Sequence, residues 1–309
     1  MDIFLQQLIN GLVLGSVYAL VALGYTMVYG ILELINFAHG EITMMGAMVA
    51  LAVIGALALA APGLPGVLVL GAGLAVAIPV CVALGLLIER VAYRPLRHAP
   101  RLAPLITAIG VSIILQNIAM LVWGKQYIPF PAILPQGRHE VLGAHITDVQ
   151  IAILLLTMSI MLMLILVVQK TRLGRAMRAT AQSRQVASLM GVDVNRVIAS
   201  TFVIGSALAA VAGVMVSAYY GLAHYYMGFL LGLKAFSAAV LGGIGNLGGA
   251  MLGGLLLGLI ESFGAGYIGD LTGGFLGSHY QDVFAFFVLI AVLVFRPQGL
   301  LGARVVERA

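Results

Sequence analysis

Apolar residues run along this chain in stretches of about 20, separated by short polar or Gly/Pro-bearing segments. A helix needs about 20 apolar residues to cross the hydrocarbon core of a bilayer, where it satisfies its own backbone groups. The pattern therefore predicts membrane-spanning helices over residues 8–30, 42–61, 66–88, 103–123, 149–169, 197–217, 225–243, 249–268 and 281–296.

Composition supports this interpretation. Hydrophobic residues make up 62% of the chain and charged residues 9%, whereas about 25% of residues are charged in soluble globular proteins. The 39 glycines are typical of closely packed membrane helices. The single cysteine, Cys81, lies in an apolar run, which indicates a small core residue and excludes a disulfide framework. We expect an all-α, polytopic integral membrane helix bundle of about 8–10 transmembrane helices, forming one domain over residues 1–309.

Basic residues cluster in three segments: 90–101, 170–196 and the tail from Arg296 onward. Positive charge beside membrane spans stays in the cytoplasm, so all three segments, the C-terminus included, are predicted to be cytoplasmic. An even number of crossings must then separate the second segment from the tail. This predicts two spans in the Gly-rich region 221–268, with a turn near Gly242–Gly249, and places segments 124–148, 218–224 and 269–280 outside. The N-terminus is also external if 8–30 crosses once.

The basic segment between residues 171 and 196 has the spacing of a short amphipathic helix. Met177, Ala181 and Val186 supply part of its apolar face. Gly191 suits the left-handed position that ends a helix, and Asp193 suits the cap of the next span. Two interpretations stay open: a helix that rests on anionic membrane lipid, or one whose apolar side chains dock into a groove of a soluble partner.

Several stretches together resemble one family across nearly the full chain. The run 185–191 is similar to a degenerate Glu-Ala-Ala-x-x-x-Gly signature in the cytoplasmic coupling loop of ABC-importer permeases, with Gln185 and Val186 in place of Glu and Ala. The other matching stretches are "YTMVYGILELINFAHGEITMMGA" (25–47), "ERVAYRPLR" (89–97), "TAIGVSIILQN" (107–117), "TAQSRQVASLMGVDVNRVIASTFVIGSALAAVAG" (180–213) and "KAFSAAVLGGIGNLGGAMLGGLLLG" (234–258). The chain thus resembles the branched-chain amino-acid ABC permease family, LivH-type subunit.

This resemblance implies an ABC-importer permease fold in the bacterial inner membrane, with a cytoplasmic coupling loop at about 170–196. It implies a LivM-type permease partner, two LivG/LivF-type ATPases and a periplasmic substrate-binding protein. The residues expected to contact the ATPases are Arg178, Arg184, Val186, Ala187, Leu189, Met190 and Gly191. We expect no cofactor on this chain, because its only lysines, Lys125, Lys170 and Lys234, complete no phosphate-binding loop, so partner subunits would use the ATP.

Polar residues inside predicted spans are candidates for a translocation path, because a charge at the bilayer centre costs at least about 2.5–3.5 kcal/mol. The richest cluster is the break Asn36–Glu41 with Tyr25 before it, as in broken helices that present backbone dipoles to a substrate. A plain polar turn at the cytoplasmic face is the alternative. The path residues expected are Tyr25, Asn36, His39, Glu41, Lys234 and Asn246. Lys234 has the alternative of extending toward an interface, and Gln116, Asn117 and Glu261 are expected to form interhelical hydrogen bonds.

The expected function is transport of Leu, Ile, Val or related hydrophobic amino acids by alternating access, not enzymatic catalysis. No catalytic constellation, metal site or nucleic-acid-binding feature is predicted. Two alternatives stay open: a permease of the same family for urea, short amides or other amino acids, and a self-contained ion-coupled carrier using Glu41, Glu261 and Asp270.

Overall fold

The computed structural model describes residues 2–97, 99–100, 102–133, 135, 137–272 and 280–302. Most of the predicted loop 269–280 and the tail beyond Gly302 lie outside these residues. The side chain of Asp270 is likewise outside the described part.

Each of the nine predicted spans coincides with a helix, which confirms the all-α bundle. These helices are α1 (Asp2–Leu32), α2 (His39–Ala60), α3 (Gly66–Ile88), α4 (Leu102–Trp123), α5 (Asp148–Lys170), α8 (Val194–Tyr220), α9 (Met227–Gly242), α10 (Leu247–Leu271) and α11 (Gln281–Phe295). Among the described residues, seven helices are long and apolar enough to cross a membrane. The other two, α9 and α11, are shorter than a full span.

Helix α1 forms the centre of the bundle. In its most apolar stretch, 94% of the residues are buried, and its most extensive contact is with α10. Glycines make this contact close: a Cβ atom on Gly258 would lie 2.2 Å from the backbone nitrogen of Gly15. Because lipid is as apolar as the helices, no hydrophobic force holds them together in the membrane. Close approach of the two backbones stabilises the pair through van der Waals contacts instead.

Helices α3, α4 and α5 lie at the outside. Only 22–28% of their most apolar stretches is buried, and they expose large side chains such as Leu87, Ile106 and Leu162. A long helix that is apolar on all sides, and that the rest of its chain leaves uncovered, is typical of a membrane span that faces lipid. The buried Cys81, 0% exposed, belongs to the core as predicted.

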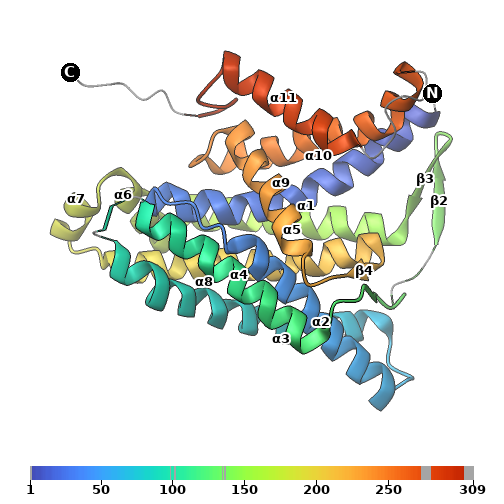
Figure 1. Cartoon of the computed structure of the whole chain (residues 1–309), viewed down its shortest axis with the longest axis horizontal. Helices are drawn as coiled ribbons and strands as arrows, with labels where there is room; N and C mark the ends of the chain where they lie inside the picture. Colours follow the sequence, from blue (N-terminus) through green and yellow to red (C-terminus); the bar gives the residue numbers. More distant parts are fainter. Residues whose placement is uncertain are drawn as a thin grey trace.

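The two ends of the bundle carry different elements (Figure 1). One end carries the hairpin of β2 (Arg138–Val141) and β3 (Ala144–Thr147), and Gln6 near the N-terminus bonds to the backbone of His145 there. A second small sheet pairs β1 (Ile128–Pro129) with β4 (Leu222–Ala223). We call the end with the hairpin the hairpin end.

The opposite end, which we call the basic end, carries α6 (Arg172–Gln182) and α7 (Arg184–Leu189) (Figure 1). It also holds the end of α3, which continues as a π-helical turn, η1 (Glu89–Tyr93), and a 3₁₀ turn, η2 (Arg94–Leu96). Arg97, just after η2, donates a hydrogen bond to Asn195 at the start of α8, which links the basic segment 90–101 to the basic segment 170–196. Two of the predicted basic segments therefore share one end.

The predicted turn between two helices in the Gly-rich region is present. It connects α9 to α10 and uses Gly243 at φ 106°, a backbone conformation that favours glycine. The C-terminal segment lies against it, because the backbone nitrogens of Leu300 and Leu301 bond to the carbonyls of Leu241 and Gly242. A cavity between this turn and α6 places the turn at the basic end.

Candidate functional site

Helix α2 begins inside the bundle, not at its end. A Cβ atom on Gly24 would lie 2.2 Å from His39 Nε2, so the first turn of α2 lies beside Gly24. Gly24 precedes the end of α1 at Leu32 by two helical turns, a rise of about 12 Å. The segment 33–38 therefore runs back into the bundle from the basic end. The break thus connects the end of α1 to the start of α2, and the N-terminus of α2 is buried in the bundle.

The polar side chains of this break form a buried cluster. Asn36, His39 and Glu41 are each at most 2% exposed and Tyr25 is 3% exposed. The rings of Tyr25 and His39 meet edge to face at 4.9 Å, and Phe236 of α9 lies 6.1 Å from the Tyr25 ring. Three helices, α1, α2 and α9, thus enclose the cluster.

Asn36 fixes the backbone as the chain enters α2. Its Oδ1 accepts hydrogen bonds from the Ala38 backbone nitrogen at 3.2 Å and from the Tyr93 hydroxyl at 3.1 Å. Its Nδ2 has no hydrogen-bond partner among the described residues. Tyr93 belongs to η1, so the break is linked directly to the π-helical end of α3. The sequence analysis did not identify this tyrosine as part of the cluster.

Glu41 connects the cluster to α4. Its Oε1 accepts hydrogen bonds from Ser112 Oγ at 3.1 Å and Gln116 Nε2 at 2.7 Å. Its Oε2 has no hydrogen-bond partner among the described residues. The expected interhelical role of Gln116 is confirmed, whereas Asn117 bonds to the Ile113 carbonyl of its own helix.

Close glycine contacts hold α9 against the break. A Cβ atom on Gly40 would lie 2.3 Å from the Gly228 carbonyl, and one on Gly228 would lie 2.6 Å from Glu41 Oε2. A Cβ atom on Gly232 would lie 2.9 Å from the Tyr25 hydroxyl. These contacts leave no room for even a methyl group between α9 and the polar atoms of the break.

Lys234 belongs to a different buried network. Its Nζ lies 2.6 Å from Glu261 Oε1 and 2.7 Å from Asp282 Oδ1, and Tyr18 donates to Glu261 Oε2 at 3.0 Å. Its side chain is 15% exposed and ends between the buried Glu261 and the 41% exposed Asp282 at the start of α11. The network joins α1, α9, α10 and α11, and the predicted interhelical role of Glu261 is confirmed.

Asn246 lies in the turn at the basic end, exposed and apart from the break. Its Oδ1 accepts from the Gly249 backbone nitrogen at 3.2 Å, which caps the start of α10, and its Nδ2 donates to the Leu301 carbonyl at 2.8 Å. Of the six expected path residues, the structure thus gathers Tyr25, Asn36, His39 and Glu41 and leaves Lys234 and Asn246 elsewhere.

The basic segment forms two helices, where the sequence predicted one. Helix α6 ends at Gln182, and α7 begins after Ser183. Ser183 has an extended backbone, and its side chain accepts a hydrogen bond from the Val186 backbone nitrogen, so it caps α7. The predicted helix end at Gly191, with φ 82°, and the cap at Asp193, which accepts from the Arg196 backbone nitrogen, are both present.

Three of the seven expected coupling residues hold this segment onto its own chain. Arg178 donates to the Val168 carbonyl at the end of α5, and Arg184 Nε donates to the Ile31 carbonyl at the end of α1 at 3.0 Å. A cation suits the negative end of a helix dipole. Ala187 is 3% exposed. These residues orient α7 and leave other side chains of α7 facing solvent.

Val186, Leu189 and Met190 form an exposed apolar surface on and just after α7, which we call the α7 apolar face. They are 57%, 86% and 80% exposed at the basic end. Large apolar side chains gathered at the surface mark interaction sites. The α7 apolar face therefore has the character of a docking surface.

Comparisons with known proteins agree with these features. Residues 7–293 match the profile of a family described as "Branched-chain amino acid transport system / permease component". The chain is 51% identical to the high-affinity branched-chain amino acid transport system permease protein BraD of Pseudomonas aeruginosa, covering 99% of this chain and 98% of that protein. It is 47% identical to the permease protein LivH of Escherichia coli K12, covering 99% and 97%.

Proposed function

Because the chain belongs to the family of permease components of branched-chain amino acid transport systems, we propose that it forms half of the translocation path of an ATP-driven importer. The proposed substrates are Leu, Ile, Val or related hydrophobic amino acids, carried across a bacterial inner membrane. The relatives BraD and LivH, which the chain covers almost completely, support this substrate class.

The observation that carries the proposal is the α7 apolar face. Because no lysine of the sequence completes a phosphate-binding loop, the proposal assigns ATP hydrolysis to partner subunits. We propose two LivG/LivF-type ATPases, which dock on α7 at the basic end. Side chains that become buried at the centre of an interface carry most of its energy. Val186 and Leu189 of α7, with Met190 just after it, are exposed on a segment that Arg184 fixes to α1. Closure of the ATPase pair would thus push directly on the central helix.

The remaining partners follow from the same scheme. A LivM-type permease would supply the other half of the path, and a periplasmic substrate-binding protein would deliver substrate at the hairpin end. The basic end, and with it the C-terminus, is proposed to lie in the cytoplasm. The polar break between α1 and α2 is proposed to open when α9 moves, exposing Asn36, His39 and Glu41 to the path.

Co-purification of the ATPases with variants of α7 tests the proposal. Val186→Asp and Leu189→Asp each bury an unpaired carboxylate in the interface, a penalty of several kcal/mol, so we expect loss of ATPase retention and of leucine uptake. Arg175→Gln is the matched control, because Arg175 is exposed and makes no hydrogen bond to a described residue through its side chain. Arg184→Ala is unsuitable as a control because it releases α7 from α1.

Normal retention of the ATPases by both aspartate variants would rule out docking on α7. Leucine uptake that continues without the ATPase genes and follows an ion gradient would instead establish the self-contained carrier with Glu41, Glu261 and Asp270. Competition by urea or short amides, without competition by isoleucine and valine, would establish the alternative substrate class within the same family.

A further inference from the structure

A cavity of about 380 Å³ opens at the basic end between the end of α3 and the start of α8. It is independent of the α7 apolar face and of the polar break. Its lining consists of Leu86, Glu89, Arg90, Arg94, Asp193, Asn195, Arg196 and Ala199.

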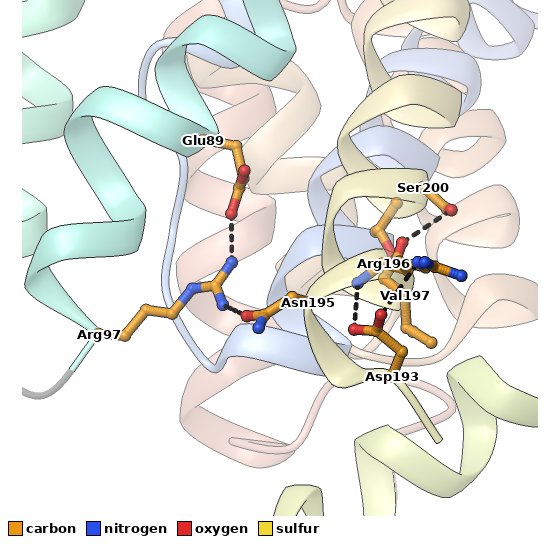
Figure 2. Close-up of polar contacts among 8 residues, drawn as sticks. Glu89, Arg97, Asp193, Asn195, Arg196, Val197 and Ser200 are labelled. Atoms are coloured by element: carbon orange, nitrogen blue, oxygen red, sulfur yellow. Dashed lines mark hydrogen bonds and ion pairs between the residues drawn. The ribbon is translucent and has the colours of Figure 1, made fainter. Parts of the chain in front are cut away.

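The acidic groups of this cavity already have partners (Figure 2). Glu89 forms an ion pair with Arg97, whose Nη1 also donates to Asn195 Oδ1 at 2.5 Å. Asp193 Oδ2 lies 3.0 Å from Arg196 Nε, and its Oδ1 caps α8. Each acid of the lining is thus paired with an arginine other than Arg90 and Arg94.

Arg90 and Arg94 supply surplus positive charge. Both are exposed, both line the cavity one turn apart, and neither makes an ion pair with a described residue. The pKa of Arg97 is lowered, chiefly because the side chain is partly buried, and Glu89 acts in the opposite direction. The positive charges of Arg94 and Arg184 lie close enough to lower this pKa further. The region thus has an excess of cations.

The cavity also adjoins the surface that faces lipid. Leu87 and Val91 neighbour its lining residues along the chain and are 57% and 67% exposed. They continue the apolar surface of α3, of which only 22% is buried in its most apolar stretch. The cavity therefore lies at the basic end beside an exposed apolar surface of α3.

We propose that this cavity binds the phosphate of an anionic phospholipid, with Arg90 and Arg94 as its ligands and an acyl chain against Leu87 and Val91. Guanidinium groups pair with phosphate oxygens through two parallel hydrogen bonds. A free phosphate ion would use the arginines alone, so the adjoining apolar side chains favour the lipid as the source of the phosphate.

Native mass spectrometry of the full-length chain in detergent tests this site by titration with phosphatidylglycerol and with phosphatidylcholine. We expect preferential retention of phosphatidylglycerol. A basic residue near a membrane surface contributes about 1 kcal/mol, so Arg90→Gln and Arg94→Gln should each weaken binding about fivefold. Leu87→Asn should weaken lipid binding as well. Arg172→Gln, an exposed arginine at the same end outside the cavity, is the control and should bind as the unmodified chain does.

Three results would overturn the proposal. Unchanged phosphatidylglycerol binding by the Arg90 and Arg94 variants would exclude the two ligands. An equal loss in Arg172→Gln would show general attraction to the basic end and no defined site. Complete competition by inorganic phosphate, with no effect of Leu87→Asn, would assign the cavity to free phosphate.

Discussion

At the scale of single residues, glycine decides how closely the helices pack. Gly258 allows α10 to meet the backbone of α1, whereas a methyl group added to Gly71 of α3 would have no described atom within 4 Å. The abundance of glycine was evident from the sequence. Which glycines bear contacts was not, because adjacent backbones come from segments that are far apart in the chain.

Alanine at these two positions should therefore act in opposite directions. Gly258→Ala forces a methyl group against the Gly15 backbone, and overpacking of this kind costs about 1–3 kcal/mol. Gly71→Ala adds helix propensity of up to about 1 kcal/mol without a clash. Thermal unfolding in detergent should show a lower midpoint for Gly258→Ala and an equal or higher one for Gly71→Ala. Equal midpoints for the two variants would contradict the close contact.

The polar break leads to a second prediction at this scale. His39→Ala and Asn36→Ala should reduce leucine uptake and leave ATPase retention unchanged, because both side chains are buried and neither belongs to the α7 apolar face. Asn117→Ala serves as the control, since Asn117 is exposed and bonds within its own helix. Unchanged uptake by both break variants would assign the cluster to packing alone.

At the scale of elements, the sequence predicted helices well and their interruptions less well. Periodicity does not show that Ser183 leaves the helical conformation, although serine is a frequent helix cap. Nor does it show how far α2 enters the bundle, because that depth depends on the contact between His39 and Gly24. The same limit applies to Lys234, whose partners Glu261 and Asp282 lie on two later helices.

The Lys234 network yields the prediction for this scale. Lys234→Met leaves Glu261 buried without its cation, and breaking a buried pair costs about 3–5 kcal/mol. Adding Glu261→Gln should recover much of that loss, because the amide oxygen can still accept from Tyr18. A denaturant titration of the two single variants and the double variant measures the coupling. Additive losses would show that the pair contributes no interaction energy.

At the scale of the whole molecule, the distribution of basic residues predicted which segments lie at the same end of the bundle. Two of the predicted basic segments share one end, and the start of the C-terminal segment lies against the α9–α10 turn at that end. Charge beside a span is a property of composition, so it can be read without knowledge of packing. In the part of the chain that the structure describes, seven of the nine apolar helices are long enough to cross a membrane. The other two, α9 and α11, are shorter.

Thiol labelling of intact cells checks the orientation. A cysteine at Glu140, exposed on the hairpin, should react with an impermeant reagent from outside, and one at Ser188 on α7 should react only after permeabilisation. The natural Cys81 is fully buried and should give little background. Reaction of Ser188→Cys in intact cells would reverse the orientation.

The central position of α1 also has a consequence for biosynthesis. Helix α1 leaves the ribosome well before α10, which begins at Leu247 and supplies its most extensive contact. At about 5–20 residues per second, the ribosome needs roughly 10–40 s to reach α10 after completing α1. During that interval the small residues of α1 face lipid or the insertion machinery without their final partner. A chain truncated before Leu247 thus keeps the contacts of α1 with α8 and α9 but lacks the most extensive one, so the face of α1 that carries Gly11 and Gly15 has no helix against it.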